Sequence, residues 1–158
     1  MLKRRHDLGL VTTYYTCCAT PAPNLFSNSD PADGAYIMAY SIATGADGYL
    51  HWSYQNWTDD PLGDTRFKLF APGDTYFIYP DGRSSIRYER MVEGIQMAEK
   101  IKALRADIEA RGDMKLMKQL NEALLPLQMG RRSKHATTAV IVENLQNDLS
   151  AISAELAR

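Results

Sequence analysis

Cysteines, histidines and long apolar runs are scarce in this chain of 158 residues, and each scarcity excludes a class of protein. The two cysteines, Cys17 and Cys18, are adjacent in sequence and cannot form a framework of disulfides. We therefore expect one buried and one half-buried thiol. His6, His51 and His135 lie far apart without ligand spacing, so the sequence predicts no metal site and no cofactor. No stretch of 18 apolar residues occurs, which predicts no membrane span.

The chain also lacks an excess of charge of either sign, since the formal net charge is -1. With 45% hydrophobic and 23% charged residues, the composition argues against disorder and carries no nucleic-acid signature. Lys3, Arg4 and Arg5 precede an apolar run at 8–11, but that run is too short for a signal peptide. The sequence therefore predicts a folded domain that contacts neither nucleic acid nor membrane, and its localisation stays unknown.

The chain divides into two halves of different composition. Residues 1–84 contain all but one of the seven prolines, whereas residues 85–158 are rich in Lys, Glu, Leu and Ala. The run at 8–17 predicts a buried strand, residues 48–54 predict the next strand, and residues 33–44 between them predict a helix. A strand, a helix and a strand with short connections predict a right-handed βαβ unit with parallel strands.

A third extended run, at 73–80, precedes a long helix predicted over 86–110, with Ser84 or Ser85 as N-cap and Gly112 as stop. The apolar stripe of this helix changes face half-way along. The first stripe comprises Tyr88, Met91, Val92 and Ile95, and the second comprises Met97, Ile101, Leu104 and Ile108. We therefore expect its first half to pack on the strand region and its second half on the tail.

The C-terminal residues predict a helical tail. One helix carries Met117, Leu120 and Leu124 up to Pro126, and a basic loop follows at 130–134. The last helix repeats apolar residues at spacings of three and four, which is typical of a coiled-coil-like seam: Val142, Leu145, Leu149, Ile152 and Leu156. We expect residues 97–158 to form an antiparallel helical tail behind an α/β region at 1–96.

Two parallel strands with one crossover helix do not make a stable sheet, because parallel strands need cover on both faces. The simplest interpretation is that this chain is the end of a larger β/α structure. The alternative is a small complete α+β domain with an unusual sheet. The uncharged strand at 8–17 would expose an edge that recruits another chain, so a self-associating copy or an upstream remainder is the expected protein partner.

Aromatic, amide and carboxylate side chains gather where the strand at 48–54 ends. Flat aromatic faces stack on sugar rings, while amides and carboxylates bind hydroxyls. Ligands of α/β folds lie at the carboxyl ends of strands, so this cluster predicts one wall of a carbohydrate site. The candidate substrate-binding residues are Tyr15, Asn24, Trp52, Tyr54, Asn56, Trp57, Asp60 and Arg66.

Structural roles remain open for the same residues. Trp52 is equally compatible with the core, and Asp60 before a proline is typical of a turn. Arg66 and Asp64 are expected to pair with each other in a loop, while Arg87 of the long helix is placed to reach a loop carboxylate. No residue of this chain is predicted to be catalytic.

Four ordered motifs carry a family resemblance: GYLHWSYQNW, DDPLGDTRF, GDTYFIYP and SSIRYERMVEGIQMAEK. Residues 9–105 resemble the C-terminal end of glycoside hydrolase family 123 proteins. The resemblance implies the last two strands of a (β/α)8 TIM-type barrel. It also implies a retaining, substrate-assisted hydrolase of N-acetyl-β-D-galactosaminides, in which an adjacent Asp-Glu pair serves as stabiliser and general acid.

The sequence contains no Asp-Glu dipeptide, so the catalytic pair would lie upstream and the chain alone is expected to be inactive. Three hypotheses follow. The chain is the substrate wall of a glycosidase, a non-catalytic carbohydrate-binding or structural module, or an oligomerisation module that acts through its helical tail. Under the first two the partner is an N-acetylhexosaminide-type glycan.

Overall fold

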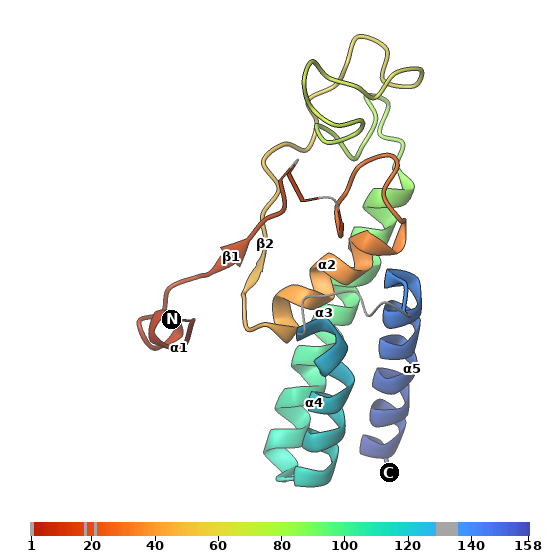
Figure 1. The fold of residues 1–158 in the computed structure, drawn as a ribbon. Helices are drawn as coiled ribbons and strands as arrows, with labels where there is room; N and C mark the ends of the chain where they lie inside the picture. The colour runs from red at the N-terminus through yellow and green to blue at the C-terminus, as the bar shows by residue number, and fades with distance from the viewer. Residues whose placement is uncertain (1, 18, 21, 129–135) are drawn as a thin grey trace.

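The computed structural model describes residues 2–17, 19–20, 22–128 and 136–158, and it is mainly helical. In Figure 1, α4 and α5 lie beside the C-terminal half of α3, while the irregular segment after β2 extends beyond the opposite end of α3. No helix in the described ranges combines the length and apolarity needed to cross a membrane. The elements in chain order are α1 (Leu2–Asp7), β1 (Thr13–Tyr14), α2 (Ala32–Ala43), β2 (Gly48–Tyr49), α3 (Ile86–Arg111), α4 (Met114–Gln128) and α5 (Thr138–Leu156).

The two predicted strands pair in parallel, as expected, but each is only two residues long. Thr13 is in register with Gly48, and Tyr14 with Tyr49. The predicted burial of the run at 8–17 is wrong, because Val11 is 71% exposed and Cys17 is also exposed. No further strand pairs with this sheet in the described chain, so hydrogen-bond partners that would extend the ladder are missing.

The extended run predicted at 73–80 is not a strand either. It makes one isolated antiparallel bridge, between Gln55 and Tyr76, and otherwise consists of turns. Residues 73–77 of this run are nevertheless buried, and Tyr76 and Phe77 are both fully enclosed. Burial of apolar side chains therefore occurs here without a sheet.

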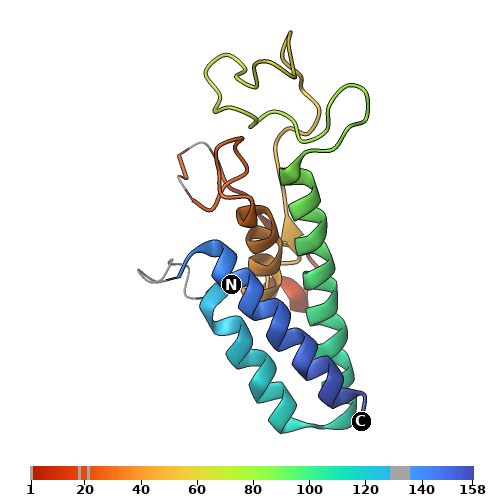
Figure 2. The same cartoon turned by 90° about the vertical axis from the view of Figure 1, so that its right-hand side faces the viewer.

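Helix α2 fills the centre of the molecule and crosses α3 closely (Figure 2). Gly94 of α3 faces Ala35 and Met38 of α2, and a Cβ built on Gly94 would lie 2.7 Å from the Ala35 carbonyl oxygen. Gly34 of α2 faces α3 in turn, where a Cβ would lie 3.0 Å from the Arg90 Cβ. The absence of two side chains is what permits this approach of the two backbones.

Helix α3 confirms the predicted caps. The Ser85 side chain accepts a hydrogen bond from the Tyr88 backbone N–H, and Gly112 ends the helix with a φ of 67°. The second apolar stripe is buried as predicted, but the first is only partly so, because Ile95 is 48% exposed. Tyr88 and Met91 of the first stripe pack against a small cluster formed by Leu25, Ile37, Met38 and Phe77.

The helical tail also follows the prediction, and all five seam residues of α5 are buried. Helix α4 continues through Pro126 to Gln128 rather than ending at the proline. The large apolar cluster joins α2 to α5 and so includes residues on both sides of the expected boundary at 96/97. Cys18, His135 and the basic loop at 130–134 lie outside the described residues.

Candidate functional site

The backbone beyond β2 is tied to the segment that leads into α3. The Asn56 N–H donates to the Thr75 carbonyl at 3.0 Å, and the Phe77 N–H donates to the Tyr54 carbonyl at 3.1 Å. The hydroxyls reinforce the pairing, since Ser53 donates to the Thr75 carbonyl at 2.8 Å and Thr75 donates to the Asn56 carbonyl at 2.7 Å. The loop that follows β2 is therefore held by hydrogen bonds although it forms no regular strand.

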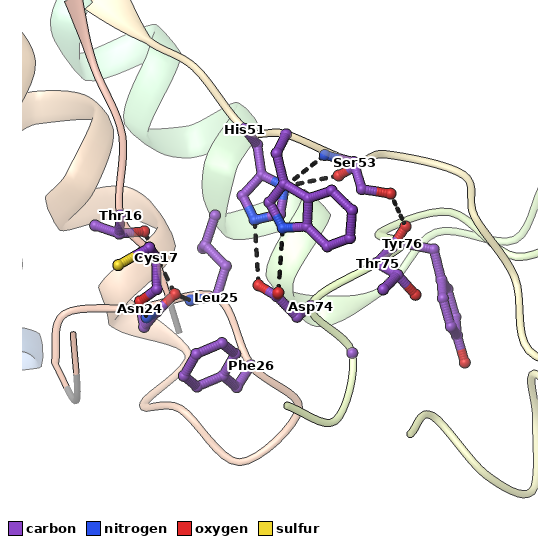
Figure 3. A network of polar contacts seen from close by, with 12 residues as sticks. Thr16, Cys17, Asn24, Leu25, Phe26, His51, Ser53, Asp74, Thr75 and Tyr76 are labelled. Carbon is purple, nitrogen blue, oxygen red and sulfur yellow. Dashed lines mark hydrogen bonds and ion pairs between the residues drawn. The ribbon is translucent and has the colours of Figure 1, made fainter. Parts of the chain in front are cut away.

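A buried carboxylate lies at the centre of this region. Asp74 is 3% exposed, and one of its oxygens accepts a hydrogen bond from the Trp52 indole N–H at 3.1 Å. Its other oxygen faces His51, whose Nε2 is 3.6 Å away (Figure 3). The Trp52 ring packs on Phe70 with centroids 4.6 Å apart, yet Trp52 remains 47% exposed. The edge of this indole is thus fixed by protein while part of its surface meets solvent.

The protonation of His51 follows from its hydrogen bonds. Its Nδ1 lies 2.6 Å from the Ser53 carbonyl oxygen and 3.4 Å from the Ser53 backbone nitrogen. Because a carbonyl oxygen can only accept, the shorter contact assigns the proton to Nδ1. The buried Nε2 has no hydrogen-bond partner within the described part of the chain. Burial lowers the pKa of His51, although the Ser53 carbonyl and Asp74 oppose the shift. The folded state therefore favours a neutral ring with a bare Nε2.

His51 should make stability depend on pH. Because its pKa is lowered in the folded protein, the unfolded chain takes up the proton first as the pH falls below the ordinary value of 6.5. We expect the free energy of unfolding to decrease as the pH falls through this window and to be fully retained above it. Urea titrations at several pH values would measure the slope of the free energy of unfolding against pH. His51→Gln should make this slope smaller, whereas His6→Gln on α1 controls for the loss of a histidine. An unchanged slope in His51→Gln would refute the assignment.

Arg87 anchors the same region from α3. Although Arg87 is only 9% exposed, its guanidinium donates to three backbone carbonyls, those of Leu25, Gly73 and Tyr76. The expected contact with a loop carboxylate is therefore replaced by contacts with carbonyls. These bonds join the loop before α2 to the loop that carries Asp74, which fixes the position of Asp74 independently of Trp52.

Side chains alternate between exposed and partly buried along the segment after β2. Leu50, Trp52 and Tyr54 are 56%, 47% and 42% exposed, whereas His51 and Ser53 are partly buried. The exposed set therefore forms an aromatic face beyond the carboxyl end of a parallel strand. Surface aromatics in that position are typical of a ligand-binding site rather than of a core.

Comparison with known proteins shows which family this chain belongs to. The model of the glycoside hydrolase 123 catalytic domain matches residues 1–104, about two thirds of the chain. The chain belongs to glycoside hydrolase family 123. The resemblance of the four sequence motifs to this family is thereby confirmed.

A solved structure is similar to nearly the whole chain, including the helical tail that the family model does not match. This structure is of a family 123 glycoside hydrolase from Clostridium perfringens, reported for the hydrolysis of glycolipid glycans. It matches with 27% identity and a TM-score of 0.74, over 99% of this chain. The chain spans 29% of the length of that relative. No curated protein matches the sequence.

The predicted site residues of the family 123 chain separate into two groups. Four lie together on the segment after β2 and are exposed: Trp52, Tyr54, Asn56 and Trp57. Tyr15, 61% exposed, follows β1 and so lies at the same edge of the parallel pair. The Trp57 indole N–H donates to the Ile78 carbonyl at 2.7 Å, so this second indole is also fixed by its edge.

The other predicted residues are engaged in the protein itself. Asn24 is 1% exposed, and its amide donates to the Cys17 and Thr20 carbonyls, so it holds the loop before α2. The Asp60 carboxylate accepts from the Gly63 backbone N–H at 3.1 Å, as in the expected turn.

Arg66 forms the expected pair with Asp64, with the guanidinium 2.8 Å from the carboxylate, and this pair holds the pKa of Asp64 at about 2. Both side chains are largely exposed in this loop. The geometry thus provides a structural role for Asn24, Asp60 and Arg66.

The sequence interpretation missed His51 and Asp74 as a unit. The dipeptide Gly73-Asp74 is typical of a turn, and the 22-residue separation of Asp74 from Trp52 gives no local signal. The alternation of side chains along 49–54 puts His51 on the face opposite Trp52, but it does not indicate which of the two faces is buried.

Elsewhere, a groove of about 400 Å³ between α4 and α5 is lined by Glu122, Asp148 and Glu155, two of which pair with lysines. The described residues contain no group of three potential metal ligands.

Proposed function

We propose that this family 123 chain supplies one wall of the substrate site of a glycoside hydrolase that acts on N-acetyl-β-hexosaminides. The observation that carries the proposal is the pair of indoles, Trp52 and Trp57, whose edges are tied to Asp74 and to the Ile78 carbonyl while the rings stay partly exposed. An indole fixed at its N–H edge offers a face of constant orientation, which suits stacking against a sugar ring.

The substrate class rests on family membership and on the relative from Clostridium perfringens, which hydrolyses glycolipid glycans. We propose a glycan that ends in an N-acetylhexosamine, with N-acetylgalactosamine as the first sugar to test. Tyr54 and Asn56 lie next to the two indoles in sequence and are exposed, so they are the proposed partners of the sugar hydroxyls and the acetamido group.

We also propose that β1 and β2 are the last two strands of a (β/α)8 barrel. Their parallel pairing, the crossover through α2 and the 29% coverage of the relative support this interpretation. The barrel part would comprise residues 1–96, and residues 97–158 would form the helical tail that supports α2 and α3 from behind. The other strands would come from residues that this sequence does not contain.

The proposed reaction is retaining and substrate-assisted, in which the acetamido oxygen of the sugar attacks the anomeric carbon. The chain lacks an Asp-Glu dipeptide, and its buried carboxylate Asp74 is committed to Trp52. We therefore propose that this chain binds and orients substrate, while the stabilising carboxylate and the general acid belong to the remainder of the barrel.

The 158-residue chain should therefore bind sugar without cleaving it. We expect no release of aryl alcohol from aryl N-acetyl-β-galactosaminide or N-acetyl-β-glucosaminide, because the pair that performs the chemistry is missing. We expect saturable quenching of tryptophan fluorescence by N-acetylgalactosamine in the millimolar range. Turnover that copurifies with the chain and survives alanine at Asp59, Asp60 and Asp64 together would overturn this placement of the chemistry.

The alternative of a structural or oligomerisation module makes a different prediction. If the aromatic face only contacts protein, N-acetylgalactosamine should leave the fluorescence unchanged at every concentration, and Trp57→Phe should alter sedimentation instead. Glucose, which lacks the acetamido group, is the control for unspecific quenching.

A further inference from the structure

Trp52 and Asp74 form a side-chain pair that the sequence keeps 22 residues apart and the fold brings to 3.1 Å. The indole is half-exposed, whereas the carboxylate is almost completely buried. Removing a carboxylate from water is costly unless its oxygens are used, so a buried Asp74 needs partners. Among the described residues, the hydrogen-bond donor to its side chain is the Trp52 N–H, and the His51 ring lies beside its other oxygen.

We propose that Asp74 is a positioning residue that sets the orientation of the Trp52 indole for the sugar, and that His51 makes this orientation respond to pH. The first half of this statement rests on the proposed function only as far as the sugar is concerned. The hydrogen bond between Asp74 and Trp52 exists whether or not the aromatic face binds a glycan.

Asp74 is suited to this role because its own position is set from elsewhere. The preceding residue, Gly73, has a φ of 78°, and its carbonyl accepts a hydrogen bond from Arg87 of α3. A Cβ on Gly73 would lie 2.4 Å from the Ser27 hydroxyl, so the loop leaves no room for a different residue. The Trp52 indole is therefore held by Asp74, a residue whose loop is fixed to α3 through Arg87.

His51 lies on the other side of the carboxylate. Its bare Nε2 faces an Asp74 oxygen at 3.6 Å, so two acceptors meet without a proton between them. Protonation would give Nε2 a hydrogen to donate to that oxygen, which would hold the carboxylate more firmly. The other charged or titratable groups near the ring are Arg87 on α3, which opposes protonation, and Tyr49 in β2, whose ring centroid is 6.2 Å away.

Two variants of Asp74 separate its role as hydrogen-bond acceptor from its negative charge. Asp74→Asn keeps an oxygen for the Trp52 N–H and places an amide N–H near the bare Nε2 of His51. Asp74→Leu removes both functions at similar size. The readout is the indole N–H resonance of each of the two tryptophans in a proton–nitrogen correlation spectrum, assigned with Trp57→Phe. Trp57 is the internal control, because its indole donates to a backbone carbonyl.

In the wild type we expect the Trp52 indole proton to be shifted downfield and protected from exchange with solvent. Asp74→Asn should retain most of this protection, and Asp74→Leu should remove it, while the Trp57 resonance stays in place in both variants. A Trp52 resonance that is unchanged in Asp74→Leu would overturn the positioning role. Movement of both indoles would show a general loss of structure, and it would overturn the specific assignment as well.

The sugar arm uses N-acetylgalactosamine as probe. Loss of the fixed orientation in Asp74→Leu should weaken binding about 3- to 10-fold, the scale of one aromatic contact, whereas Asp74→Asn should bind like the wild type. If the wild type itself binds no sugar, the proposed function fails while the indole spectra still decide the role of Asp74. If sugar binds equally well to all three proteins, the role of Asp74 in the sugar site is overturned.

The pH arm follows the same resonance. As the pH falls below 6.5, the Trp52 indole proton should shift in the wild type and stay constant in His51→Phe. The Trp57 indole should stay constant in both. A Trp52 shift that persists unchanged in His51→Phe would exclude His51 as its cause and overturn the pH-dependent part of the proposal.

Discussion

Replacing Arg87 by methionine should lower the free energy of unfolding by about 3 kcal/mol or more, since an unsatisfied buried polar group costs about 1–3 kcal/mol. The guanidinium donates to the carbonyls of Leu25, Gly73 and Tyr76, and methionine keeps the length of the stem but supplies no donor. Three buried carbonyls would lose their partner together. Urea unfolding followed by circular dichroism would measure the loss.

The neighbouring helix position gives a matched control. Arg90 lies on α3 three residues after Arg87 and forms an ion pair with Glu93 at the surface. Arg90→Met should cost less than about 1 kcal/mol, because exposed ion pairs contribute little. Arg87→Lys should fall between the two, since an ammonium group cannot reach three carbonyls spread around a planar fork. Equal losses in Arg87→Met and Arg90→Met would refute the anchoring role.

Gly94→Ala should also destabilise the protein, by about 1–3 kcal/mol, the usual cost of inserting a carbon into a packed core. The new Cβ would lie 2.7 Å from the Ala35 carbonyl oxygen and 2.7 Å from the Met38 Cβ, so α2 would have to move. This cost exceeds the gain of about 1 kcal/mol that alanine brings to a helix interior. Thermal unfolding monitored by circular dichroism would show a lower Tm.

Gly34→Ala provides a graded comparison from the facing helix. Its Cβ would lie 3.0 Å from the Arg90 Cβ and 3.2 Å from the Arg87 carbonyl oxygen, so smaller shifts suffice. We expect a smaller loss than for Gly94→Ala. A Gly94→Ala protein more stable than the wild type would show that α2 and α3 approach less closely than the structure indicates.

The helices were the most predictable part of this chain. The N-cap at Ser85, the left-handed stop at Gly112 and the seam of α5 are local signals, and all three are confirmed. The exception is Ile95, which the stripe pattern placed inside and the structure leaves 48% exposed. The pattern shows which side of a helix is apolar, but only neighbouring elements decide whether that side is covered.

The strands were predicted in position and direction but not in length. Thr13 and Tyr14 pair with Gly48 and Tyr49 as the βαβ pattern indicates. Val11 and Tyr15 flank β1 and are of types enriched in strands, yet they remain irregular because a ladder needs a partner on each side. Pairing is a property of two segments together, and one segment alone does not specify it.

The candidate site shows the same division. The sequence by itself determined the family motifs, the helical tail and the cluster of aromatic residues after β2, because each is encoded by neighbours in the chain. The exposure of Trp52, which the sequence left open, was decided by the tertiary structure. Only the tertiary structure decided that Asp74 meets Trp52, that His51 faces Asp74 and that Arg87 binds carbonyls. Those contacts join residues 11 to 62 positions apart, and their geometry depends on how loops pack on α3, which no local pattern records.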